Sequence, residues 1–162
     1  MQIIELINFG SNELKSNNIS SYKLDSEILL SKVLNKRREE LLLNLDQKVT
    51  QPKINNFKNL IKRRFKKEPI AYILQEKEFW SKDYEVSKST LIPRPETELM
   101  VEKIVKIFKE KKIFILDMGT GSGCILLSIL SELDKSNGIG IDKSKQAIFI
   151  AKQNSKKHKL SG

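Results

Sequence analysis

The sequence predicts an α/β protein in which a helical region precedes the opening of a doubly wound parallel sheet. Residues 1–70 show helical spacing of apolar side chains, and residues 71–92 are rich in aromatic and β-branched side chains. Residues 93–162 alternate apolar runs with amphipathic stretches around a glycine-rich turn. We therefore expect a helical domain, a β-hairpin linker and the first part of an α/β domain, with these bounds.

The composition is that of a globular protein, with 39% hydrophobic and 31% charged residues. The chain has neither an apolar run long enough to span a membrane nor the features of a signal peptide, so we expect no membrane partner. Cys124 is the single cysteine, which excludes an internal disulfide and fits a cytoplasmic location. The net charge of +10 suits a nucleic-acid partner or simply a lysine-rich coding bias.

The helical region shows two amphipathic stretches. In the first, apolar residues recur at helix-like intervals: Leu24, Ile28, Val33 and Leu34. In the second, Thr50 is a plausible N-cap, and the apolar face comprises Ile54, Phe57, Ile61 and Phe65. The opposite face of this second helix is basic: Lys58, Lys62, Arg63, Arg64, Lys66 and Lys67. Such a face is either solvated or a docking surface for RNA or a protein.

The middle of the chain predicts a hairpin with strands near 78–80 and 84–86, and with Trp80 in its core. In the run PRPETE, Arg94 precedes a proline and should be extended, while Pro95 suits the first position of a helix. The buried stripe expected for that helix is Val101, Ile104, Val105 and Phe108.

The run KIFILDM predicts a strand buried on both faces, and GIGID a second, short strand. The stretches GSGCILLSILSELDK and KSKQAIFIAKQNSKKHK predict the helices that follow them. Cys124 is then a small residue at a helix start, packed against the sheet, and His158 is expected to be solvated. This order is the βαβ opening of a doubly wound sheet.

The glycines between the first of these strands and its helix predict a ligand site. Gly119, Gly121 and Gly123 allow backbone angles that other residues avoid, and they let a ligand approach the N–H groups at the helix N-terminus. Crevices at the carboxyl ends of parallel strands are where ligands bind in such sheets. The alternative is a tight packing turn with no ligand.

The residues around the glycines favour one class of ligand. A P-loop would need Gly-Lys-Ser/Thr, but Gly123 is followed by Cys124, and the spacing G-x-G-x-G differs from the dinucleotide pattern. Asp117 suits a ligand with a cationic end, and Asp142 at the end of the second strand suits ribose hydroxyls. S-adenosylmethionine combines a ribose and a sulfonium with no phosphate.

The runs LIPRPETELMVE, ILDMGTGSGCI and GIGIDKSKQAIFIAKQN resemble the HemK/PrmC family of peptide chain release factor glutamine methyltransferases. The resemblance also takes in EPIAYILQEKEFW and the helical region. It implies a helical domain that recognises the release factor, a hairpin linker and a Rossmann-like S-adenosylmethionine-dependent domain. The implied reaction is methylation of the glutamine side-chain amide in the release factor's Gly-Gly-Gln loop, a protein methylation that serves translation termination.

The resemblance also implies roles for individual residues. The cofactor loop would run from Gly119 through Thr120, Gly121 and Ser122 to Gly123, with Asp117 before it. Asp142 would hold the adenosine ribose. Arg94, Pro95 and Thr97 would help to close the cofactor pocket, although Arg94 could instead be a helix-entry residue paired with a nearby acid.

One part of the family pattern does not occur. The Asn-Pro-Pro-Tyr motif, which in the family grips the substrate amide, is absent from these residues, and the sequence predicts only two strands of the larger sheet. We therefore expect an incomplete chain, as a fragment, split-gene product or frameshifted product, with a marginally stable C-terminal half and doubtful activity alone. No catalytic residue is assigned.

Two other functions fit the same residues. A nucleic-acid methyltransferase would share the cofactor loop and use the basic helix around Arg63 on phosphates. A non-catalytic binding module would use the helical domain alone. A nicotinamide-dependent dehydrogenase fits less well because of the glycine spacing. In the main hypothesis, the release factor methyltransferase contacts nucleic acid only indirectly, through the ribosome.

Overall fold

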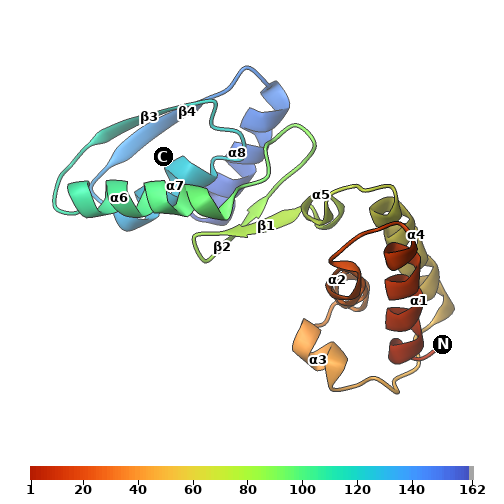
Figure 1. Cartoon of the computed structure of the whole chain (residues 1–162). Coiled ribbons are helices and arrows are strands. Elements are labelled where there is room, and N and C mark those ends of the chain that lie inside the picture. Colours follow the sequence, from red (N-terminus) through yellow and green to blue (C-terminus); the bar gives the residue numbers. More distant parts are fainter. Residues whose placement is uncertain (161–162) are drawn as a thin grey trace. The chain divides into compact units, whose positions relative to one another are not determined.

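The computed structural model describes residues 1–160 and divides the chain into two compact units, Met1–Leu74 and the chain from Gln75 onward. The first unit is helical and the second contains two small sheets with helices, so the predicted α/β class is confirmed (Figure 1). The first unit ends with a short helix, α5 (Ile70–Leu74), in a segment expected to belong to the linker. The side chain of Ile73 lies in the first unit's core, and the boundary therefore falls after Leu74.

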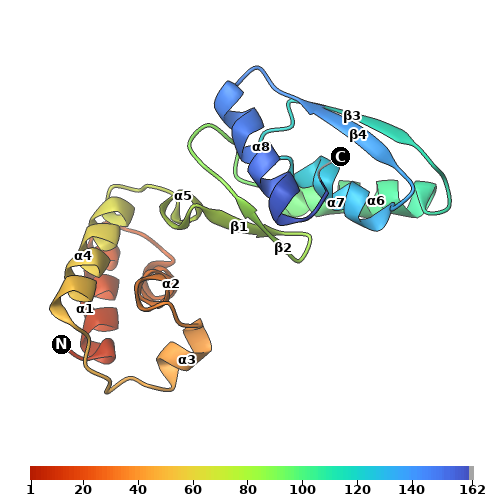
Figure 2. The ribbon, with the colours of Figure 1, turned by 180° about the vertical axis from the view of Figure 1, so that it is seen from behind.

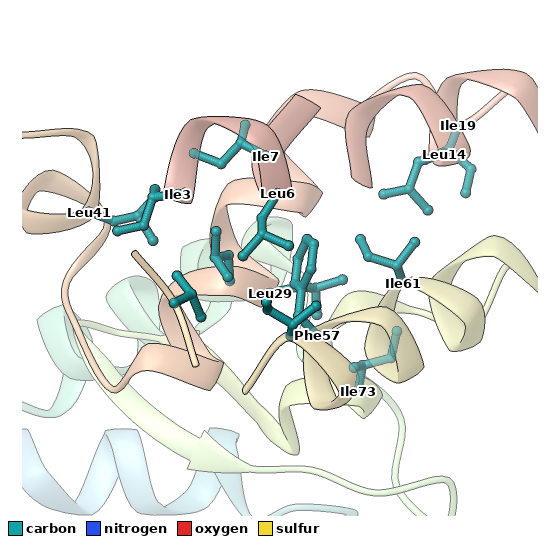
Figure 3. Packing of buried hydrophobic residues seen from close by; sticks show 13 residues of the cluster. Ile3, Leu6, Ile7, Leu14, Ile19, Leu29, Leu41, Phe57, Ile61 and Ile73 are labelled. Carbon is teal, nitrogen blue, oxygen red and sulfur yellow. The ribbon is translucent and has the colours of Figure 1, made fainter. Parts of the chain in front are cut away.

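The first unit consists of α1 (Ile3–Ser16), α2 (Tyr22–Leu34), α3 (Arg38–Leu42), α4 (Gln51–Phe65) and α5. Their apolar side chains converge in one core (Figure 3). The fully buried members are Ile3, Leu6, Leu14, Leu29, Leu30, Leu41 and Phe57. Ile54 and Ile61 are buried as predicted for α4, whereas Phe65, in the last turn of that helix, is 37% exposed.

The face that α2 buries differs from the predicted one. Leu24 is 46% exposed, whereas Leu29 and Leu30 are fully buried. The apolar periodicity misleads here because the buried face of α2 also carries two acids, Asp25 and Glu27. Buried carboxylates need charged partners, and these two have them in the arginines described next.

Three arginines of the first unit form ion pairs inside it. Arg64 Nε donates to Asp25 Oδ2 at 2.7 Å. Arg38 donates to the buried Glu27 carboxylate, also at 2.7 Å. Arg63 makes two hydrogen bonds to the Glu68 carboxylate, at 2.9 and 2.8 Å. The basic face predicted for α4 is therefore partly neutralised, and its remaining cations are lysines.

The second unit begins with an antiparallel hairpin of β1 (Glu76–Phe79) and β2 (Lys82–Glu85). Phe79 pairs with Lys82, so the turn consists of Trp80 and Ser81, with φ of 52° and 54°. This corrects the predicted strands at 78–80 and 84–86. Positive φ at both central residues is typical of the two-residue turns that hairpins prefer, but the usual Asn-Gly or Asp-Gly signal is missing from the sequence.

Trp80 is a turn residue rather than part of the hairpin core. Its backbone N–H donates to Glu98 Oε1 at 2.8 Å, and its indole N–H donates to Glu132 Oε1 at 2.9 Å. The ring is half-buried against the second unit's core. These two hydrogen bonds hold a bulky residue in a left-handed conformation that is otherwise unfavourable.

The hairpin is packed into the second unit. Phe79 and Tyr84 are almost fully buried in the same core cluster as Val101, Leu127 and Ile129. The Tyr84 hydroxyl forms a hydrogen bond of 2.8 Å with Ser128 Oγ, and burial raises the pKa of this phenol to about 12.

The PRPETE run forms a 3₁₀ turn, η1 (Pro95–Thr97), that leads into α6 (Glu98–Phe108). Arg94 is extended, as predicted for a residue before proline, with φ −102° and ψ 137°. Of the stripe predicted for this helix, Val101 is fully buried, and the others pack against the core as partly buried residues.

The α/β part continues with β3 (Phe114–Met118), α7 (Cys124–Glu132), β4 (Asn137–Ile141) and α8 (Lys145–Lys157). The two strands are parallel, with Asp117 opposite Gly140. In both views of the ribbon, α6, α7 and α8 lie on one side of the β3–β4 pair (Figures 1 and 2). On that side, α7 packs closely against β4. A Cβ added to Gly138 would stand only 2.7 Å from Leu126 Cδ1.

The prediction that the first strand is buried on both faces is wrong for this chain. Alternate residues of β3 and β4 point to the side without helices, and their side chains are between 43% and 75% exposed. This open face consists of Phe114, Leu116, Met118, Ile139 and Ile141. The apolar run KIFILDM fits a strand with two covered faces, but within residues 1–160 only one face has helices packed on it.

His158 follows α8 and is not solvated as expected. Its ring centroid lies 4.7 Å from that of Tyr84, and burial is the main cause that lowers its pKa. Within residues 1–160, no helix combines the length and the apolar character that crossing a membrane requires.

The open face allows a paired test of the sheet. We expect Leu116→Thr to change the free energy of unfolding by less than about 0.5 kcal/mol, because Leu116 is already 56% exposed. Ile129→Ala, at a residue 1% exposed, should cost about 2–4 kcal/mol. Urea unfolding of both variants measures this. Equal costs for the two would mean that the face is covered in solution.

Gly10 in α1 provides a test of the helical core. A Cβ there would stand 2.4 Å from Ser26 Oγ and 2.8 Å from the Phe57 ring. Alanine improves helix propensity by about 1 kcal/mol, but we expect overpacking to outweigh this, so that Gly10→Ala destabilises the first unit by about 1–2 kcal/mol. Thermal unfolding followed by circular dichroism measures this. The control is Asn12→Ala on the exposed face of the same helix, which should be neutral or stabilising in that measurement.

Candidate functional site

The glycine-rich turn leaves the carboxyl end of β3 and enters α7, as the sequence indicates. It is fastened to the end of the neighbouring strand, because the Gly119 and Thr120 amides both donate to the Ile141 carbonyl, at 2.8 and 2.9 Å. Further along, the Gly123 amide donates to the Thr120 carbonyl at 2.8 Å. The loop from 119 to 123, called the glycine loop below, thus has a defined shape set by backbone contacts.

The three glycines of this loop have positive φ: 81° at Gly119, 58° at Gly121 and 79° at Gly123. The prediction that these positions need glycine is therefore confirmed. Their surroundings differ. A Cβ on Gly123 would press on Leu127 and Ala151 at 3.1 and 3.3 Å, whereas one on Gly119 would meet no atom within 4 Å. Gly123 is needed for packing as well as conformation, and Gly119 leaves the main chain open to a ligand.

Asp142 follows β4 directly and is bound to the glycine loop. Its Oδ2 accepts from the Gly121 amide at 3.0 Å, and its Oδ1 accepts from the Ser144 amide at 2.9 Å. These two hydrogen bonds, from Ser144 first and Gly121 second, lower the carboxyl pKa below its ordinary value of 3.8. A carboxylate has about four acceptor positions, so two remain for other hydroxyl or amide donors.

Asp117 and Thr120 form a second contact beneath the loop. The Thr120 hydroxyl donates to Asp117 Oδ2 at 2.7 Å. Thr120 is 7% exposed, and its side chain lies against Gly140, where an added Cβ would stand 2.8 Å from Thr120 Oγ1. The Thr120 side chain therefore supports the loop from the sheet side.

Ser122 is also buried, with 2% of its surface exposed. Its carbonyl oxygen accepts a hydrogen bond of 2.9 Å from the side-chain amide of Asn154 in α8. Of the predicted loop residues, Gly119 is exposed and Gly121 half-buried, whereas the Thr120 side chain and the Ser122 carbonyl are engaged in hydrogen bonds.

The PRPETE residues lie at the start of α6, and within residues 1–160 no hydrogen bond or ion pair joins them to the glycine loop. Arg94 and Pro95 are exposed and Thr97 is half-buried. The Thr97 amide donates to the Arg94 carbonyl at 3.0 Å, which closes the turn. In the described part of the chain, Arg94 forms no ion pair, so the alternative of pairing with a nearby acid is not observed.

Cys124 starts α7 and is 8% exposed, as predicted for a packing residue. Burial is the main cause that raises the pKa of its thiol, which opposes the thiolate that a nucleophile requires. No group of three potential metal ligands among His, Cys, Asp and Glu occurs in residues 1–160.

Sequence reasoning missed three kinds of supporting residue. Ser144 is the N-cap of α8 and accepts from the Ala147 amide at 3.2 Å; its position before an amphipathic stretch was an available signal. Gly138 and Gly140 permit close packing on β4. Asn154, one of three amide side chains in α8, carried no signal in the sequence that set it apart.

Comparison with known proteins gives matches in both units. Residues 5–74 match the PrmC N-terminal domain, and residues 109–162 match a methyltransferase domain. A release factor glutamine methyltransferase of Buchnera aphidicola subsp. Baizongia pistaciae is 44% identical over 161 residues, which cover 99% of this chain and 58% of the relative. That of Buchnera aphidicola subsp. Acyrthosiphon pisum is 43% identical over 88% of this chain and 52% of the relative.

A bifunctional methyltransferase of Rickettsia conorii is 38% identical over 98% of this chain and 35% of its own length. The chain therefore spans about half the length, or less, of the curated relatives that it matches. Its second unit is the opening of a methyltransferase domain. Together with the match of the preceding helical unit to the PrmC N-terminal domain, this makes the chain similar to the HemK/PrmC proteins, as the sequence motifs indicated.

The Asp142 contacts predict a specific pH dependence of the glycine loop. Since the folded-state pKa lies below 3.8, the stabilisation is fully present above that pH and is lost as the pH falls through the folded value. Carboxyl-carbon NMR should give this depressed pKa, and the Gly121 amide proton should titrate with it. In Asp142→Asn the titration of the Gly121 amide should vanish. If it persists, another acid is responsible.

Proposed function

We propose that the glycine loop and Asp142 form part of the binding site for S-adenosylmethionine, in a methyltransferase that acts on the glutamine amide of peptide chain release factors. The observation that carries the proposal is the open backbone at Gly119 beside a carboxylate, Asp142, that is already ionised and held in place. The family relationship supports the reaction class.

The residues fit this cofactor on physical grounds. Asp142 is oriented by two amides and retains acceptor positions that suit the two hydroxyls of a ribose. Asp117, oriented by Thr120, adds negative charge beneath the loop. A phosphate would be repelled by these two carboxylates, whereas an ammonium or sulfonium would be attracted. When bound, S-adenosylmethionine supplies an electrophilic methyl group.

The substrate amide needs more than a methyl donor. An amide nitrogen is a weak nucleophile, because its lone pair is delocalised into the carbonyl, so it must be held in line with the methyl group and its N–H groups must be accepted. The Asn-Pro-Pro-Tyr motif to which the family resemblance assigns this role does not occur in these 162 residues. We therefore assign to this chain cofactor binding and recognition of the release factor by the first unit, and no step of the transfer itself.

A nucleic-acid substrate is the weaker alternative. Its expected contact surface was the basic face of α4, but Arg63 and Arg64 are engaged with Glu68 and Asp25. The Arg64 side chain is 18% exposed. Arginine forks are the groups best suited to phosphate recognition, and here they stabilise the helical domain instead.

Calorimetric titration tests the cofactor site. We expect S-adenosylmethionine to bind residues 1–162, and Asp142→Ala to weaken the affinity by about 10- to 100-fold, because one or two hydrogen bonds to a charged acceptor are lost. Asp134→Ala, in the turn between α7 and β4, is the control and should bind normally. Binding of ATP or NAD in place of S-adenosylmethionine would overturn the proposal.

The substrate is tested separately. A release factor should bind the chain through residues 1–74, with little dependence on salt, whereas duplex or single-stranded nucleic acid should bind weakly and with the steep salt dependence of phosphate contacts. The reverse order of affinities at physiological salt would favour the nucleic-acid alternative.

A further inference from the structure

Asn154 in α8 is a fully buried polar side chain with no role in the function described so far. Its amide nitrogen donates to two carbonyl oxygens, that of Glu85 at 3.0 Å and that of Ser122 at 2.9 Å. Its amide oxygen accepts from the Glu85 N–H at 2.7 Å. One side chain thus joins the last residue of strand β2 to the middle of the glycine loop, across 69 and 32 positions of sequence.

We propose that Asn154 is a positioning residue for the cofactor site: its carboxamide fixes the glycine loop to the hairpin and so sets the loop's affinity for the adenosyl ligand. The second half of this statement rests on the proposed function. The first half is a statement about the loop alone, and it is testable without any ligand.

At Ser122, the glycine loop needs a contact with another part of the chain to fix its conformation. Ser122 stands between Gly121 and Gly123, which have the largest conformational freedom of any residue type. The C=O and N–H of one trans peptide group point in opposite directions. A hydrogen bond to the Ser122 carbonyl therefore also aims the Gly123 N–H, which donates to the Thr120 carbonyl at 2.8 Å.

The surface of α8 is shaped for this contact. Ala147, Ala151 and Asn154 lie three and four residues apart and share one face of the helix. A Cβ on Gly123 would stand 3.3 Å from the Ala151 Cβ, so the helix and the loop are already at close range. Small side chains permit that approach, and Asn154 supplies the polar link beside them.

The same hairpin offers a matched control. Tyr84, next to Glu85, forms a buried hydrogen bond of 2.8 Å with Ser128 in α7. Tyr84→Phe removes a hydrogen bond from the same core and the same strand but leaves the Ser122 carbonyl untouched. A purely structural role for Asn154 would make Asn154→Ala and Tyr84→Phe behave alike in every measurement of the loop.

The first experiment is amide hydrogen exchange of residues 1–162 without ligand. Asn154→Ala removes three hydrogen bonds, of which one holds the glycine loop. We expect the loss of that one to accelerate exchange at Gly123 by about tenfold, with the amides of β3 as the internal reference. Tyr84→Phe should leave Gly123 unchanged relative to β3. Equal acceleration in both variants, or none in Asn154→Ala, would overturn the proposal.

The second experiment is calorimetric titration of the same proteins with S-adenosylmethionine, at a temperature where all are folded. The dissociation constant should rise about tenfold in Asn154→Ala and less than about threefold in Tyr84→Phe. If the unsubstituted chain does not bind S-adenosylmethionine, the proposed function fails. Hydrogen exchange still tests whether Asn154 fixes the conformation of the glycine loop. A loosened loop with unchanged affinity would overturn the link to the ligand.

Asn154→Ser provides a milder change if the alanine variant does not fold. The unsubstituted chain supplies a further measurement. If Asn154 joins the two segments, the Glu85 and Gly123 amides should open with the same free energy as urea is added. Separate opening of the two amides would contradict the proposal.

Discussion

The second unit depends on how the end of β4 holds the turn that leaves β3. The Ile141 carbonyl accepts two loop amides and the next residue, Asp142, accepts a third. A turn with three left-handed glycines has a high conformational entropy when unfolded, so its shape requires contacts from outside itself. The parallel pairing of β3 with β4 brings those contacts to the same edge of the sheet, and the loop, α7 and the carboxylates take their positions from that edge.

Much of this arrangement can be predicted from the sequence, because glycine, proline and acidic residues have strong preferences for particular backbone conformations and positions. The positive φ of Gly119, Gly121 and Gly123, the extended Arg94 and the βαβ order were all predictable from residue type and spacing. Asp142 could be placed after the second strand for the same reason. What the sequence did not reveal is that Asp142 already binds the loop, because this depends on strand pairing.

The differences between the predicted and the observed structure have a common cause, which is contact between residues far apart in the sequence. Helix α2 turns its acids inward because arginines from α3 and α4 meet them there, and no local pattern within α2 specifies those partners. The hairpin turn falls on Trp80 and Ser81 because glutamates from α6 and α7 hold the tryptophan. Asn154 was overlooked for the same reason, since both of its partners lie far away in the chain.

The position of Trp80 has a practical consequence. It is the single tryptophan of the chain, and it is tied to α6 and α7 in the second unit, whereas the first unit has none. Indole emission therefore reports the unfolding of the α/β unit, while the ellipticity at 222 nm is weighted toward the helical unit. Recording both signals on one sample separates the stabilities of the two units without cutting the chain.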